Sequence, residues 1–256
     1  MKKHGSVLGF YARSSGYKVL LVLLIMALAE LGVFLVVFQG ELANYHEIRQ
    51  FVNEEGVQTA NLIRPENLME RSNISWFFAV AGIMVSVILS LPGCEFGSKA
   101  GYTIKRLQIS ERACFFWQVF CNLTLYFLVY VVQIALAFGF GQYYIRQAPS
   151  ELVGNQSVFL MFYRSEFLHA LLPLADIRIW IRNLFLLVGL SFASASFSYQ
   201  QRRKKRPMAL YLMLVCTLFF FSQPIGDFSN FIFLVLVSLS VITKQLFTVL
   251  QEEEVS

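Results

Sequence analysis

The sequence predicts an all-α integral membrane protein with six transmembrane helices. Of its 256 residues, 57% are hydrophobic and 14% are charged, whereas a typical soluble domain carries about 25% charged residues. Six apolar segments meet or approach the roughly 20 residues that a helix needs to cross a bilayer. The Lys and Arg residues cluster beside those segments, as expected for connections that are sorted by charge across a membrane.

The six apolar segments define the expected helices. They span residues 17–38, 74–92, 120–141, 179–199, 208–224 and 228–247. The first segment is long and has no small-residue cleavage site, so we expect a retained helix rather than a cleaved signal peptide. No connection is long enough to separate soluble domains, so residues 1–256 are expected to form a single transmembrane domain.

The basic residues also predict how the chain is oriented. Fourteen of the 21 Lys and Arg residues fall in the N-terminal segment and first helical turn, in the connections after the second and fourth helices, and at Lys244. The positive-inside rule assigns that side to the cytoplasm. Both termini are therefore expected inside, with residues 1–16 as a cytoplasmic interfacial segment and 248–256 as a cytoplasmic tail. The alternation of apolar and small polar residues in 1–16 favours a short interfacial helix that leads into the first span, whereas Gly5, Gly9 and Gly16 disfavour it.

Two segments are expected on the outer side. One is the polar stretch 39–73, and the other is the loop 142–178, which contains an apolar stretch, 158–175, with charges in its middle. A full span there would place charged groups at mid-bilayer, at a cost on the order of 3 kcal/mol each, and would move the basic cluster 202–206 outside. We therefore expect an amphipathic helix in the outer interface or a re-entrant element packed against protein. Its polar residues include Arg164, Glu166 and His169.

Composition argues against several classes of function. The net charge is +5, but the basic residues follow the membrane topology, so we do not expect nucleic-acid binding. The four cysteines have neither CxxC nor Cys/His spacing, and the three histidines lie far apart, so no metal site is expected. No acid, base and nucleophile converge, so the chain is not expected to be an enzyme. The serines of the fourth helix indicate close helix packing; they are Ser191, Ser194, Ser196 and Ser198.

Glu30 is the ionisable residue that stands out in the apolar segments. It lies near the middle of the first helix, where a carboxyl group needs a partner, a water-filled cavity or protonation. Two interpretations stay open. Glu30 lines a substrate path or a subunit interface, or it joins two helices as a neutral or hydrogen-bonded carboxyl group with Gln133 as its partner.

The connection after the second helix has glycines, a serine and a lysine like those of a phosphate-binding loop. It reads PGCEFGSKAGYTIKRLQISER over residues 92–112. A phosphate-binding loop needs four residues between its glycines and then Gly-Lys-Ser/Thr. Here Gly93 and Gly97 are separated by three residues, Ser98 precedes Lys99, and Ala100 replaces the hydroxyl group. The loop is therefore not expected to bind a nucleotide.

The residues of the same connection also match a second sequence pattern, which differs from that of a phosphate-binding loop. A Glu residue follows the second helix, and small residues after it form a turn. A short Thr-Ile-Lys-Arg-Leu segment comes next, and a Ser-x-Arg sequence then leads into an apolar helix. The residues are Glu95, Gly97, Gly101, Thr103, Ile104, Lys105, Arg106, Leu107, Ser110 and Arg112. This order resembles the first cytoplasmic loop of ABC-2-type exporter permeases, in particular the small permeases of antimicrobial-peptide resistance and immunity systems in Gram-positive bacteria. Gln108, Ile109 and Glu111 depart from the family pattern.

The resemblance implies a function and its partners. Residues 93–113 would form a coupling loop that docks on an ATP-binding cassette ATPase, and a second permease chain would complete the transport path. Because this chain lacks a Walker-type loop and an LSGGQ signature, ATP and Mg²⁺ would bind to the ATPase and this chain would hold no cofactor. The cargo would be a hydrophobic or amphipathic peptide, a lipid-like molecule or an antibiotic, exported across a bacterial cell membrane. An integral membrane enzyme, and a membrane sensor or assembly protein, are the alternatives.

Overall fold

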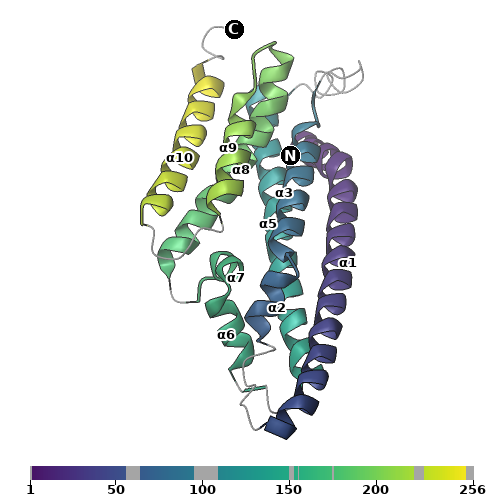
Figure 1. Ribbon diagram of the computed structural model, residues 1–256. Helices are drawn as coiled ribbons and strands as arrows, with labels where there is room; N and C mark the ends of the chain where they lie inside the picture. The colour runs from purple at the N-terminus through teal and green to yellow at the C-terminus, as the bar shows by residue number, and fades with distance from the viewer. Residues whose placement is uncertain are drawn as a thin grey trace.

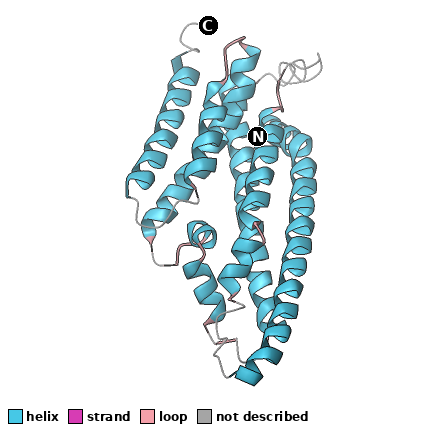
Figure 2. Cartoon of the chain, in the orientation of Figure 1, coloured by secondary structure: helices cyan, strands magenta, loops and turns pink. Residues whose placement is uncertain are grey.

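The structure is a computed structural model that describes residues 2–55, 64–94, 109–149, 153–154, 156–174, 176–221 and 228–251. Within these ranges every regular element is an α-helix (Figure 2), as predicted. The helices are α1 (Lys2–Glu55), α2 (Pro65–Arg71), α3 (Ile74–Ser90), α5 (Glu111–Gln147), α6 (Ser157–Arg164), α7 (Glu166–Leu171), α8 (Ile177–Arg202), α9 (Met208–Phe220) and α10 (Phe228–Gln251).

Four helices of the described chain are long and apolar enough to cross a membrane, namely α1, α5, α8 and α10. A fifth crossing arises if α2 and α3, which meet at 49°, are counted as one bent span. Helix α9 is apolar but has only 13 residues. The chain is therefore an all-helical protein with the character of a multi-pass membrane protein.

Helix α1 is longer than the sequence predicts. Its 54 residues correspond to about 80 Å at 1.5 Å per residue, well beyond the roughly 30 Å of a bilayer core. Residues 2–16, expected as a separate interfacial segment, continue the helix without a break, and so does the stretch from 39 to 55. Tertiary packing outweighs the glycine penalty, because Val7 and Tyr11 are buried against Cys114 and Cys121 of α5.

Helix α8 lies at the centre of the bundle and contacts α3, α5, α9 and α10, whereas α1 packs on α3 and α5 (Figure 1). The approach of α9 and α10 to α8 is close at Gly189. A Cβ atom there would lie 2.7 Å from Met213 Cε of α9 and 3.2 Å from Ser238 Cβ of α10. Glycine thus favours this close three-helix contact, because any larger residue would displace Met213 and press on Ser238.

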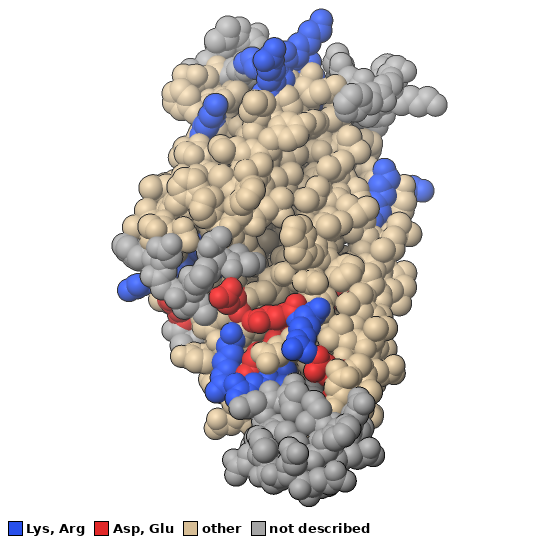
Figure 3. Space-filling view, viewed as in Figure 1, with Lys and Arg blue, Asp and Glu red and all other residues tan. Residues whose placement is uncertain are grey.

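The two ends of the bundle differ. The first residues of α1 and the last residues of α10 lie at one end, here called the terminal end, and α2, α6 and α7 lie at the other, here called the opposite end (Figure 1). On the face shown in Figure 3, the coloured residues at the terminal end include Lys and Arg but no acidic residue, whereas Asp and Glu gather in the half nearer the opposite end.

Residues 158–175, expected as an amphipathic helix or as a re-entrant element packed against protein, contain two short helices, α6 and α7. Ser165 between them is extended, with ψ of 122°, and both helices are packed against protein. In one straight helix, Phe162 and Leu168 would point about 120° apart. The break at Ser165 lets both side chains enter the same core with Tyr144 of α5, which is the physical reason that two short helices form in place of a single one.

Candidate functional site

Helix α5 carries a polar face along most of its length. Its members recur every three or four residues, so they lie on one side of the helix, and all are buried. They are Gln118, Asn122, Tyr126, Tyr130 and Gln133. Because buried polar groups in an apolar bundle need partners, this polar face organises the helices around it.

Tyr126 joins three helices through its hydroxyl group. It donates to Ser86 Oγ of α3 at 2.8 Å and lies 2.7 Å from Ser194 Oγ of α8. Both serines also donate to carbonyl oxygens of their own helices, so each hydroxyl group is satisfied. The serines of α8 are buried as close packing requires, and Ser194 contributes to this polar contact as well.

A second polar cluster holds α7 against α5 and α8. Asn183 Nδ2 donates to Ala170 O at 2.9 Å and to the Tyr130 hydroxyl oxygen at 3.2 Å. Tyr130 in turn donates to Leu171 O, and Arg182 Nη2 donates to Ala170 O at 3.2 Å. The last carbonyl groups of a helix lack partners within the helix, so these side chains act as its cap and fix the end of α7 in the bundle.

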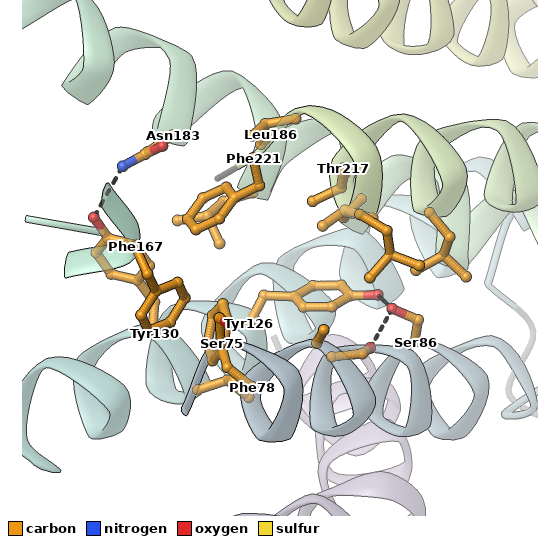
Figure 4. A pocket seen from close by; sticks show the side chains of 17 residues that line it. Ser75, Phe78, Ser86, Tyr126, Tyr130, Phe167, Asn183, Leu186, Thr217 and Phe221 are labelled. Carbon is orange, nitrogen blue, oxygen red and sulfur yellow. Dashed lines mark hydrogen bonds between the residues drawn. The ribbon is translucent and has the colours of Figure 1, made fainter. Parts of the chain in front are cut away.

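An apolar cavity lies between these two clusters. Its volume is about 120 Å³, and its walls come from α3, α5, α7, α8 and α9. Figure 4 shows the bonded Tyr126 and Ser86 at one end of the cavity and the bonded Asn183 and Tyr130 at the other. The rings between them belong to Phe78, Phe167 and Phe221. An apolar hollow with a few polar groups is the usual form of a ligand site, although ligand pockets are typically 300–1,000 Å³.

Glu30 and Gln133, the pair named from the sequence, are in contact. Gln133 Nε2 donates to Glu30 Oε2 at 3.1 Å, and both side chains are fully buried between α1 and α5. Glu30 Oε1 and Gln133 Oε1 have no hydrogen-bond partner within the described residues. Neither residue lines the cavity, so the structure supports the helix-joining contact and leaves a role in a substrate path as a hypothesis.

Most of the expected coupling residues fall outside the described ranges, namely Glu95, Gly97, Gly101, Thr103, Ile104, Lys105, Arg106 and Leu107. The last two, Ser110 and Arg112, are described. Ser110 is the N-cap of α5, and its Oγ accepts a hydrogen bond from Ala113 N at 3.3 Å. Ser is a preferred N-cap residue because its short side chain satisfies a free N–H group of the first turn.

The start of α5 is bonded to the ends of two other helices. Arg112 donates from Nε to Val249 O at 3.3 Å and from Nη2 to Leu250 O, both in the last turn of α10. Glu111 forms an ion pair with Arg203, directly after α8, with an N–O distance of 2.8 Å. We call these contacts the α5 junction.

Gln118 adds the end of α3 to the α5 junction. Its Nε2 donates to Pro92 O at 3.2 Å, and its Oε1 accepts from Ser198 Oγ of α8 at 2.9 Å. The described residues on either side of 95–108, which are Cys94 and Ile109, therefore lie close to contacts that connect α3, α5, α8 and α10.

The sequence prediction missed several of these residues. The polar face of α5 was detectable from its spacing, because Gln118, Asn122 and Gln133 interrupt an apolar run at helical intervals. The pairing of Asn183 and Arg182 with the carbonyl groups of α7 had no sequence signal, since it joins a helix to the end of another through backbone atoms.

Within the described residues, no group of three or more His, Cys, Asp or Glu side chains is placed to hold a metal ion. The four cysteines are buried free thiols. Comparisons with protein-family models, with characterised proteins and with solved structures give no match for this chain.

Proposed function

We propose that this chain is the permease subunit of an ABC-2-type exporter, driven by a separate ATP-binding cassette ATPase. The α5 junction is the observation that carries the proposal. The expected coupling loop 93–113 ends with residues that are bonded to α10 and to Arg203, directly after α8. The N-terminal end of the coupling loop is connected to the α5 junction as well, through the hydrogen bond from Gln118 to Pro92 O. A displacement of the segment by an ATPase would thus act on four helices together.

Six crossings and two cytoplasmic termini belong to this proposal. Helices α1, α5, α8 and α10 have the length of full spans, and α2 with α3 would form a bent one. Helix α9 is about 20 Å long and would complete its crossing with residues beyond Phe220. Consecutive crossings run in alternate directions (Figure 1), and the basic residues at the terminal end favour a cytoplasmic position for that end.

The chemistry of the cavity between Tyr126 and Asn183 is consistent with a cargo that is apolar or amphipathic. Its walls provide apolar contacts, and its two ends provide hydrogen-bonding groups. A volume of about 120 Å³ admits one side chain or a short acyl segment, so whole cargo requires the helices to separate. A second permease chain, identical or related, would then complete the path for a peptide, a lipid-like molecule or an antibiotic.

The proposal is tested by co-purification of this chain with an ATP-binding cassette ATPase from the same cells. We expect a tagged permease in mild detergent to retain that ATPase, and Lys105→Glu combined with Arg106→Glu to lose it. Arg146→Glu is the matched control, because Arg146 is exposed at the far end of α5 from the junction. Retention of the ATPase by the double variant, or its absence from the wild-type preparation, would contradict the proposed coupling.

A further inference from the structure

A groove opens at the terminal end between α9 and α10. Its volume is about 810 Å³, which is within the range of small-molecule sites. At its base, Gln200 of α8 donates from Nε2 to Gln245 Oε1 of α10 at 2.9 Å, and both side chains are buried. The groove therefore has a fixed polar floor and lies apart from the cavity beside Tyr126.

The lining residues of this groove include three cations and no acidic residue. The cations are Lys205, Arg206 and Lys244. The side chains of Arg206 and Lys244 make no hydrogen bond or ion pair with any other described residue. Three positive groups that face one hollow repel one another, so the groove favours an anionic occupant.

The backbone holds two of the cations at the mouth of the groove. Lys204 is in the left-handed conformation with φ of 56°. Its N–H group donates to Gln201 O at 3.1 Å, and the N–H group of Lys205 donates to Gln200 O at 3.0 Å. This is the pair of hydrogen bonds that defines a Schellman motif at the end of a helix. The turn therefore places Lys205 and Arg206 in a defined position without any ligand.

The wall that belongs to α9 is apolar. Met208, Leu212 and Val215 line the groove and are each about half exposed or more. Across from them, Ser240 and Thr248 lie on the same face of α10 as Lys244, and their hydroxyl groups donate to carbonyl oxygens of their own helix. The groove thus combines cations with an adjoining apolar surface, which matches a molecule with an anionic head and a hydrocarbon chain.

We propose that this groove binds an anionic phospholipid, with its phosphate held by Lys205, Arg206 and Lys244 and an acyl chain along α9. Basic pockets between helices on the cytoplasmic side are suited to anionic headgroups, and the cytoplasmic leaflet is the one rich in them. The assignment to that leaflet rests on the proposed orientation of the chain, whereas the match of charge and apolar surface does not.

The acidic residues that follow α10 in the sequence are the rival occupant. Glu252, Glu253 and Glu254 come directly after the last helix, and their carboxylates have the charge that the groove favours. A lipid and this acidic tail are distinguished by variants that remove one set of charges at a time.

The test is native mass spectrometry of the purified full-length chain in non-ionic detergent. Phosphatidylglycerol and phosphatidylcholine with the same acyl chains are added in turn. We expect several-fold more phosphatidylglycerol to remain bound, and Arg206→Gln with Lys244→Gln to weaken its binding by roughly fivefold for each charge removed. The control, Arg13→Gln with Lys18→Gln, removes two exposed charges of α1 and should retain the lipid.

Four results would overturn the proposal. The first is equal binding of the two lipids, and the second is equal loss of phosphatidylglycerol in both double variants, which would indicate only general charge attraction. The third is a preference that arises only after Glu252, Glu253 and Glu254 are changed to Gln, which would assign the groove to the tail. The fourth is displacement of the lipid by glycerol phosphate alone, which would indicate a site for free anions. None of these results depends on an ATPase, so they leave the proposed coupling untouched.

Discussion

Arg112, in the first turn of α5, donates from Nε to Val249 O, in the last turn of α10, at 3.3 Å. The two residues are 137 positions apart in the sequence. The last carbonyl groups of a helix have no partner within the helix and carry partial negative charge. A guanidinium group is therefore a favourable cap, and it connects the start of one helix to the end of another.

Replacement of Arg112 by Ala should destabilise the bundle and weaken coupling. Hydrogen bonds from a charged group contribute about 1.5–3 kcal/mol, and the partial exposure of Arg112 places the expected loss near the lower end. We expect a lower thermal unfolding midpoint in detergent and a larger relative loss of ATP-dependent transport. Arg146→Ala provides the comparison, and equal midpoints for the two variants would contradict the structural role of Arg112.

Replacement of Gly189 by Ala should destabilise the contact of α8 with α9 and α10. The added Cβ would lie 2.7 Å from Met213 Cε, which can move, and 3.2 Å from Ser238 Cβ, which is attached directly to the backbone of α10. Overpacking of this kind costs about 1–3 kcal/mol. Gly32→Ala is the control, because no atom lies within 4 Å of its Cβ position, and it should stabilise α1 by up to about 1 kcal/mol. Thermal unfolding of both variants would show opposite shifts, and shifts of the same sign would count against the close approach at Gly189.

Replacement of Glu30 separates the two interpretations of its role. Glu30→Ala leaves the buried amide of Gln133 without its acceptor, which costs about 1–3 kcal/mol. Glu30→Gln keeps the size of the side chain and an acceptor oxygen, so we expect normal levels in the membrane for this variant. If Glu30 serves transport, both variants should lose transport by more than their change in stability explains. Unchanged transport at normal membrane levels would leave Glu30 as a structural residue only.

His169 of α7 should make stability depend on pH. Burial lowers the pKa of its ring below the ordinary value of 6.5, with a smaller opposing effect of Asp176 and a further lowering by Arg182. The unfolded chain therefore binds a proton more readily than the folded chain. Stability is then fully present above pH 6.5 and declines as pH falls below that value.

The measurement for His169 is the thermal midpoint at about pH 8 and about pH 5. We expect the wild-type midpoint to fall at the lower pH and His169→Gln to show a smaller fall. Identical pH dependence in the two proteins would assign the effect to other groups.

The positions of the main helices followed from the sequence because apolar runs of membrane length have few other ways to satisfy their backbone groups. The contact between Glu30 and Gln133 was also accessible, since a buried carboxyl group needs a partner and few polar residues stand at a matching depth. These predictions depend on the local composition of the chain, which can be read from a single sequence.

The elements that were mispredicted depend on tertiary contacts. The unbroken helix through Gly5, Gly9 and Gly16 is stabilised by packing on α5, and the break at Ser165 arises because two faces of the chain enter one core. The left-handed position of a Schellman motif is usually glycine, but in the turn after α8 it is Lys204. The sequence therefore gives no signal for this turn.

The most direct test of the coupling claim is a cross-link between position 105 and the ATPase. The native thiols are all buried, so Lys105→Cys would introduce a thiol that reacts selectively with a short bifunctional cross-linking reagent. In membranes that contain both proteins, we predict a cross-linked pair of permease and ATPase whose yield changes when ATP is added. Arg146→Cys should give no such product. Absence of the product from position 105, or equal yields from positions 105 and 146, would contradict the proposal that this chain receives the motion of an ATPase through residues 93–113.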